Sequence, residues 1–333
     1  QAAVNSILLG CSVGVAGTVL GFIFAFAVTR LSLPKWLCAA VSAVTLLPLL
    51  SPPFTSSIAL TLSLGPNGIL LDFFGLGNFN FYGFWGTFIS ETLTFFPVAF
   101  MTLSTILARI DPNLEDAAYS LGASSFKVFR TVTLPLAAPG IANAFLLVFS
   151  CSLADFATPQ VLGGHSFPVL PTQAYLVITG MYDFKGGAAL SFMLLIPAII
   201  VYSLQRWWVG KKSYVTVSGK AGGRSSVKGP GPLLSSVIVA TVAVVIAFIL
   251  YLYAIILTGS LVKVWGVNNE ITLENYSYVF THGSKAIKDT LLIACIGTPL
   301  GGLLAVLVGY ATARLKVRGS RILETVSLLN YTL

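Results

Sequence analysis

Residues 233–258 read LLSSVIVATVAVVIAFILYLYAIILT, an apolar run of 26 residues that contains no charged side chain. About 20 residues of α-helix are enough to cross the hydrocarbon core of a bilayer. Lipid offers no hydrogen-bond partner to a free backbone group, so a run of this kind crosses the membrane as a helix. The stretch therefore predicts a transmembrane helix.

Similar runs recur along the chain, which is 56% hydrophobic and only 9% charged. A soluble domain of 333 residues needs more charge to cover its surface, so the surplus apolar surface must face lipid. The other predicted spans are roughly 5–29, 37–60, 84–108, 137–157, 188–209 and 287–313, with the start of an eighth near Ile322. The fold class predicted is an all-α polytopic bundle in a lipid bilayer.

The cations indicate how the bundle is oriented. Of the 19 Lys and Arg residues, 15 lie after the first, third, fifth and seventh runs, on alternate connections. Cytoplasmic loops carry such an excess, so these connections are predicted to be cytoplasmic. The net charge of +8 is then an orientation signal, and nucleic acid is not an expected partner.

The sequence also predicts a parallel internal repeat. With an offset of 284 residues, the helix-end pattern A-x-x-R-L at 27–31 returns at 311–315. Six spans separate the copies, and an even number leaves both copies pointing the same way. The Gly-, Ser- and Lys-rich segment 210–232 has the composition of a cytoplasmic linker. The predicted organisation is a first half over 1–209 with five spans, this linker, and the start of a truncated second half over 233–333.

One cytoplasmic connection stands apart. Its sequence, RIDPNLEDAAYSLGASSFKVFRTVTLPLAAPG at 109–140, predicts a helix with Asp111 as N-cap and Pro112 in the first turn. Gly122 suits the left-handed position after that helix. We expect a second short helix, capped by Ser124 or Ser125, to end at Leu134-Pro135. An apolar stripe runs along the first helix and consists of Leu114, Ala117, Ala118 and Leu121.

This connection resembles the EAA loop of permeases in binding-protein-dependent ABC importers. The family pattern is E-A-A-x3-G-x9-I-x-L-P, and the chain departs from it only by Asp for Glu and Val for Ile. The resemblance implies a type I importer fold in the bacterial inner membrane and a coupling loop over 111–135 that binds a cytoplasmic ABC ATPase dimer. The residues implied in coupling are Asp116, Ala117, Ala118, Leu121, Gly122, Val132, Leu134 and Pro135.

Other segments are similar to the fused, two-half ferric-iron permeases. They are 155–159 with 162–164, then 170–172, and 214–220. The resemblance implies a periplasmic or lipid-anchored substrate-binding protein as partner and ferric iron as substrate, with thiamine, phosphonate or polyamine as alternatives. A second EAA loop is expected near position 400, beyond the sequence.

The sequence shows no nucleotide-binding motif G-x-x-x-x-G-K-[ST]. We therefore expect a transport subunit without catalytic residues, metal or cofactor of its own, with ATP acting through the partner ATPase. The rival class is a secondary transporter driven by an ion gradient. Glu91, inside the third span, favours it, since an acid there usually faces the bundle interior or water. Glu91 and Asp155 are the candidates for lining a translocation path or contacting the binding protein. A membrane enzyme would need clustered His, Asp or Glu, which the sequence does not offer.

Overall fold

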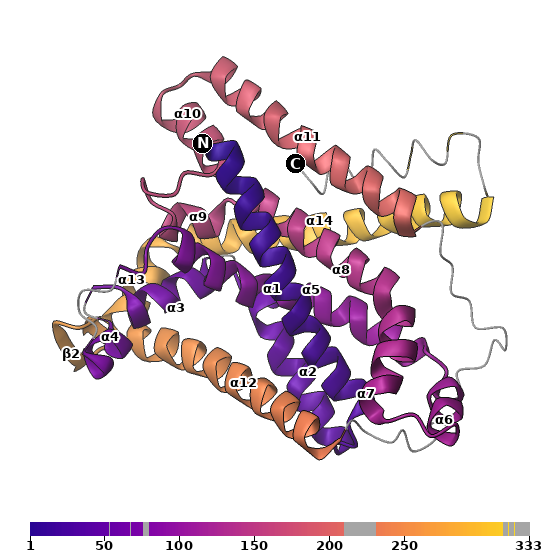
Figure 1. Cartoon of the computed structure of the whole chain (residues 1–333). Coiled ribbons are helices and arrows are strands. Elements are labelled where there is room, and N and C mark those ends of the chain that lie inside the picture. The colour runs from indigo at the N-terminus through magenta and orange to yellow at the C-terminus, as the bar shows by residue number, and fades with distance from the viewer. Residues whose placement is uncertain are drawn as a thin grey trace. The chain divides into compact units, whose positions relative to one another are not determined.

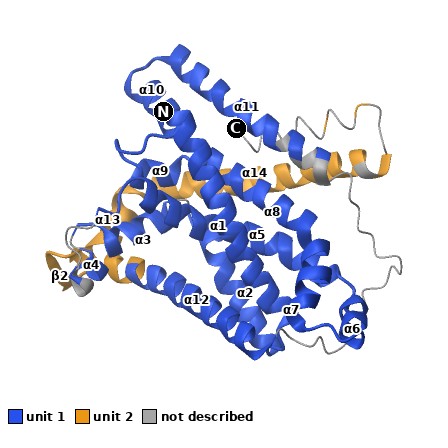
Figure 2. Cartoon of the chain, viewed as in Figure 1, with its two compact units in different colours: residues 1–255 blue, residues 256–333 orange. Residues whose placement is uncertain are grey.

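The computed structural model describes residues 1–52, 54–66, 68–75, 80–209 and 231–315, together with positions 319 and 323. The chain forms two compact units, residues 1–255 and 256–333 (Figure 2). Segment 214–220, nearly all of the predicted linker and the start of the eighth span near Ile322 lie outside the described residues. The division into two halves joined by a linker therefore stays a prediction.

Three long helices form the centre of the first unit (Figure 1): α1 (Ala2–Arg30), α5 (Phe84–Arg109) and α8 (Leu134–Ala154). Gly21 shows how closely they pack. A Cβ atom on Gly21 would lie 2.6 Å from the Ala99 Cβ and 2.7 Å from the Phe100 backbone nitrogen. Association of helices in lipid relies on such close packing of small residues, because apolar surface alone gives no drive there.

The predicted span 37–60 is two helices instead of one. Helix α2 covers Lys35–Leu50, α3 covers Thr55–Leu64, and the short α4 covers Ile69–Phe74. The break follows from the sequence Ser51-Pro52-Pro53, because a residue before proline avoids the helical region. Ser51 accordingly has extended backbone angles (φ −78°, ψ 156°).

The rest of the first unit follows α8 in the chain. Helices α9 (Ala157–Leu162), α10 (Leu170–Gly180) and α11 (Phe184–Val209) come first, and most of α12 (Pro232–Ser260) completes the unit. Tyr251 on α12 shares a hydrogen bond of 3.0 Å with Ser63 of α3, and Tyr253 pairs with Ser51. Hydroxyl pairs therefore hold α12 against the broken span.

The second unit contains one feature that the sequence did not suggest. After α12, strands β1 (Val262–Val264) and β2 (Asn268–Ile271) form an antiparallel hairpin in which Val262 faces Ile271 and Val264 faces Asn268. Helices α13 (Glu274–His282) and α14 (Ser284–Tyr310) follow, and a π-helical turn, η2 (Ala311–Leu315), ends the unit's described structure.

Six helical segments of the described residues are long and apolar enough to cross a membrane, and the broken pair α2–α3 raises the number to seven if it counts as one span. They are Ala2–Arg30, Phe84–Arg109, Ser125–Ala154, Phe184–Val201, Pro232–Ser260 and Ser284–Tyr310. The predicted all-α polytopic fold is confirmed.

Candidate functional site

The first helix of the predicted coupling loop is α6 (Pro112–Ser120), and it begins as predicted. The Asp111 side chain accepts a hydrogen bond of 3.0 Å from the Asn113 N–H, and Pro112 occupies the first turn. A cap of this type satisfies one of the N–H groups that a helix start leaves free, and proline there loses no hydrogen bond. The start of α6 is thus fixed by its own sequence.

The end of α6 depends on a glycine. Gly122 has φ +80°, its N–H donates to the Tyr119 carbonyl at 2.9 Å, and the Ala123 N–H donates to the Ala118 carbonyl at 3.1 Å. These two bonds satisfy carbonyl groups that the helix end would otherwise leave free, and only glycine takes this backbone conformation without strain. The prediction for Gly122 is confirmed.

The predicted end of the second helix at Leu134-Pro135 is wrong. Helix α7 (Ser125–Val128) starts at Ser124, whose hydroxyl accepts from the Lys127 N–H at 3.4 Å, and it continues through a π-helical turn, η1 (Phe129–Thr133), into α8. In this turn the Leu134 N–H donates to the Phe129 carbonyl, five residues back. Proline lacks an N–H and its ring crowds the preceding turn of an α-helix. The wider π turn accommodates Pro135, so the proline lies within a continuous helix.

The predicted stripe of α6 lies at the surface. Leu121 is 88% exposed and Leu114 49%, while Ala117 is exposed and Ala118 half-buried. Asp116 is also half-buried, and Gly122 is exposed. Beyond the turn, Val132 is half-buried, whereas Leu134 and Pro135 are exposed. An exposed apolar stripe of this kind is suited to binding a partner protein.

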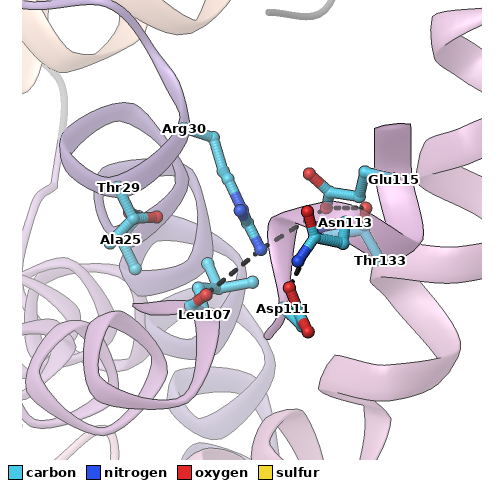
Figure 3. Close-up of polar contacts among 8 residues, drawn as sticks. All are labelled: Ala25, Thr29, Arg30, Leu107, Asp111, Asn113, Glu115 and Thr133. Atoms are coloured by element: carbon cyan, nitrogen blue, oxygen red, sulfur yellow. Dashed lines mark hydrogen bonds and ion pairs between the residues drawn. The ribbon is translucent and has the colours of Figure 1, made fainter. Parts of the chain in front are cut away.

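One buried cluster that was not predicted from the sequence joins α6 to the bundle (Figure 3). Glu115 on α6 pairs with Arg30 at the end of α1, with 3.4 Å between the Glu115 Oε1 and Arg30 Nη2 atoms. The Thr133 hydroxyl donates to the same carboxylate oxygen at 2.7 Å, and Arg30 Nη2 also donates to the Leu107 carbonyl at 3.2 Å. Both charged side chains are only 5% exposed. The sequence feature that could have drawn attention to Arg30 is the repeated pattern A-x-x-R-L, which contains this residue.

Glu91 and Asp155 lie in a second polar region. Glu91 on α5 is fully buried, and the Ser152 hydroxyl of α8 donates to its Oε2, while its Oε1 has no partner among the described residues. Asp155 directly follows α8, its Oδ1 accepts from the Ala157 N–H at 2.9 Å, and burial raises the pKa of its carboxyl group. Ser152 links the two residues, because its carbonyl also accepts a hydrogen bond of 3.2 Å from the Asp155 N–H.

Hydroxyl groups continue this polar region between α3 and α5. Ser57 and Ser90 lie 3.2 Å apart through their Oγ atoms, and the Thr94 hydroxyl donates to Ser56 at the same distance. All four side chains are buried. No group of three or more His, Cys, Asp or Glu residues suited to a metal ion occurs within the described part of the chain.

The arrangement of helices matches that of a known transporter class. A crystal structure of a bacterial ABC transporter involved in the import of the acidic polysaccharide alginate aligns with a TM-score of 0.51 at 15% identity, over 64% of this chain and 79% of that chain. At this identity the likeness concerns the fold alone.

The family follows from the sequence comparison. A family model described as "Binding-protein-dependent transport system inner membrane component" matches residues 17–213. The chain belongs to this family and is a multi-pass permease of the inner membrane.

Two curated relatives are similar along nearly the whole chain. The ferric transport system permease protein FbpB of Actinobacillus pleuropneumoniae and the putative ferric transport system permease protein FbpB 1 of Haemophilus influenzae are each 36% identical over 98% of this chain. The matched region is 48% of the first relative and 52% of the second. The chain thus spans about half the length of these proteins.

Proposed function

We propose that this permease is part of an ATP-driven importer and that α6, with the residues that follow it, binds the ATPase. The observation that carries the proposal is the exposed apolar stripe of α6, which continues to Leu121 directly after the helix; Leu121 is 88% exposed and lies within the EAA-like segment. Asp111 and Gly122 fix both ends of the helix, so the stripe is presented on a preformed element. A preformed helix loses less conformational freedom when it binds.

In this proposal the chain itself does not hydrolyse ATP. ATP binds to a separate pair of ATPase subunits, whose closure moves α6 and changes the access of the bundle from one side of the membrane to the other. A periplasmic or lipid-anchored binding protein delivers the substrate. The distribution of Lys and Arg supports a cytoplasmic position for α6.

The test is co-purification in detergent of the permease with a tagged ATPase subunit that carries the nucleotide-binding motif. We expect the wild type to retain the ATPase and the variants Gly122→Asp and Ala118→Glu to lose it, because each introduces a charge at the predicted contact. Gly180→Asp is the matched control, since Gly180 also has open space around it. Failure of the wild type to retain any ATPase would refute the proposal.

Ferric iron is the substrate that we propose. Support comes from the two relatives, both named as ferric transport permeases and both similar over 98% of this chain. Uptake of radiolabelled ferric iron into vesicles that contain the permease, its ATPase and an iron-loaded binding protein tests this. Uptake of thiamine, a phosphonate or a polyamine in place of iron would reassign the substrate without changing the machinery.

The polar region around Glu91 and Asp155 is our candidate for part of the translocation path. Polar side chains inside a membrane bundle are costly and commonly mark the route of a substrate. Glu91→Gln and Asp155→Asn are expected to reduce iron uptake without loss of the ATPase, whereas Glu274→Gln, on an exposed helix, serves as control. Unchanged uptake in both variants would remove these residues from the path.

Glu91 also favours the one rival that we retain, a secondary transporter driven by an ion gradient. A fully buried acid within a span is a feature that such a transporter uses. Dissipating the proton and sodium gradients while ATP is maintained separates the two classes, since only the rival stops importing.

A further inference from the structure

Helix α6 is attached to the bundle in an unusual way. Glu115 is the only buried residue of its nine, and it is 4% exposed. Amphipathic helices are normally held by an apolar face. On α6 the apolar stripe is exposed instead, and the buried contact is a charged one.

That contact reaches each of the three central helices. Arg30 ends α1, and Leu107, whose carbonyl it contacts, lies in the last turn of α5. Thr133, which donates to the Glu115 carboxylate, directly precedes α8 (Figure 3). A displacement of α6 therefore acts on the ends of α1, α5 and α8 at a single cluster of side chains.

The chemistry of the cluster makes this attachment sensitive to any displacement of α6. A buried ion pair with shared hydrogen bonds tolerates little displacement, because breaking it leaves a charge without a partner. Networks of hydrogen bonds and ion pairs are among the contacts that carry energetic coupling between distant sites.

We propose that Arg30 and Glu115 form a positioning pair that carries the movement of α6 into the transmembrane bundle. The inference rests on the proposed function, because the movement in question is the one that the ATPase drives. The pair does not itself bind the ATPase; it determines whether binding and ATP hydrolysis at α6 lead to transport.

The experiment measures two quantities in vesicles that contain the full complex: retention of the ATPase, and radiolabelled ferric iron imported per ATP hydrolysed. The variants are Arg30→Gln, Glu115→Gln and Arg30→Lys. Arg109→Gln is the matched control. It removes the same charge as Arg30→Gln, but from an exposed position at the end of α5. Thr133→Val, which removes one hydrogen bond and no charge, covers the case in which the charge variants fail to fold.

We expect Arg30→Gln and Glu115→Gln to retain the ATPase and to lower the iron imported per ATP by about tenfold. Arg30→Lys and Thr133→Val should lower it less, and Arg109→Gln should leave it unchanged. The proposal is overturned if import per ATP stays within about twofold of wild type, which includes the case in which total import falls only in proportion to the ATPase retained. A wild type without ATPase would refute the proposed function instead, so the two failures are distinguishable.

Discussion

The centre of the first unit and helix α6 are held in place by different kinds of contact. In the centre, α1 lies so close to α5 that a single added carbon at Gly21 would meet both a side chain and the backbone of α5. At α6 the buried contact is the ion pair between Glu115 and Arg30, while Leu114 and Leu121 remain exposed.

Under the proposed function, this difference separates a part that moves as a body from a part that binds a partner. Close packing of small residues leaves the central helices few alternative arrangements, since packed interiors do not deform continuously. A helix whose buried contact is a polar one keeps its apolar side available for a partner. Substitutions in the two regions should therefore fail in different ways, and the following predictions test that.

Arg30→Ala should have the largest effect, and it should be local to α6. Removing one partner of a buried ion pair costs about 3–5 kcal/mol, because the other charge stays buried. We expect hydrogen–deuterium exchange over 112–120 to rise strongly while exchange over 86–100 in α5 changes little. A uniform rise in both regions would mean that the cluster supports the whole bundle.

The double variant Arg30→Ala with Glu115→Ala sharpens this prediction. Removing both charges avoids the buried unpaired carboxylate, so the double variant should exchange more slowly at α6 than Arg30→Ala alone. Simple addition of the two single effects would contradict the ion pair as the cause.

Gly21→Leu should have the next largest effect, and it should destabilise the centre. Excess volume in a packed core costs about 1–3 kcal/mol. The melting temperature of the purified protein should fall, and exchange should rise in α1 and α5 together. Gly180→Leu is the matched control, because a Cβ atom at Gly180 meets nothing within 4 Å. Equal melting temperatures of the two variants would show that α1 and α5 are not tightly packed at Gly21.

A structural feature of either region could be predicted from the sequence when the residues that determine it are close together in the chain. Apolar length predicts the spans, and local backbone chemistry predicts Asp111 and Gly122 at the ends of α6. Both signals are contained within one turn or one helix. The continuous helix through Pro135 was missed because proline usually ends a helix, and the π turn that accommodates it has no clear sequence pattern.

The buried pair could not be predicted for a different reason. Arg30 and Glu115 are 85 positions apart, and Arg30 looked like one of many cations that orient the bundle. Glu115 is next to Asp116, the acid of the EAA-like motif. The two acids differ only in which of them lies on the side of α6 that faces the bundle. Glu115 is buried, whereas Asp116 is half-buried. Packing of separate elements decides this, and no local pattern encodes it.

Gly122→Ala should have a smaller effect, confined to the end of α6. A Cβ atom there has open space, so the cost is that of the left-handed backbone alone, about 1 kcal/mol. We expect faster exchange at 118–123 and weaker retention of the ATPase, with Gly180→Ala as control. An effect as large as that of Arg30→Ala would mean that the helix end, and not the ion pair, holds α6 in place.

Glu91→Gln should have the smallest effect on stability, although Glu91 is the more deeply buried of the two glutamates that are buried in the described part of the chain. Glutamine has nearly the same shape, its carbonyl oxygen can still accept from the Ser152 hydroxyl, and no cation among the described residues loses a partner. We therefore expect a loss below about 1 kcal/mol, against about 2 kcal/mol for Glu115→Gln, which removes a charge-assisted contact with Arg30. Urea or thermal unfolding of the two purified variants, side by side, measures the difference. The reverse order would show that the stability of a buried acid in this bundle depends on depth, and not on the presence of a cation.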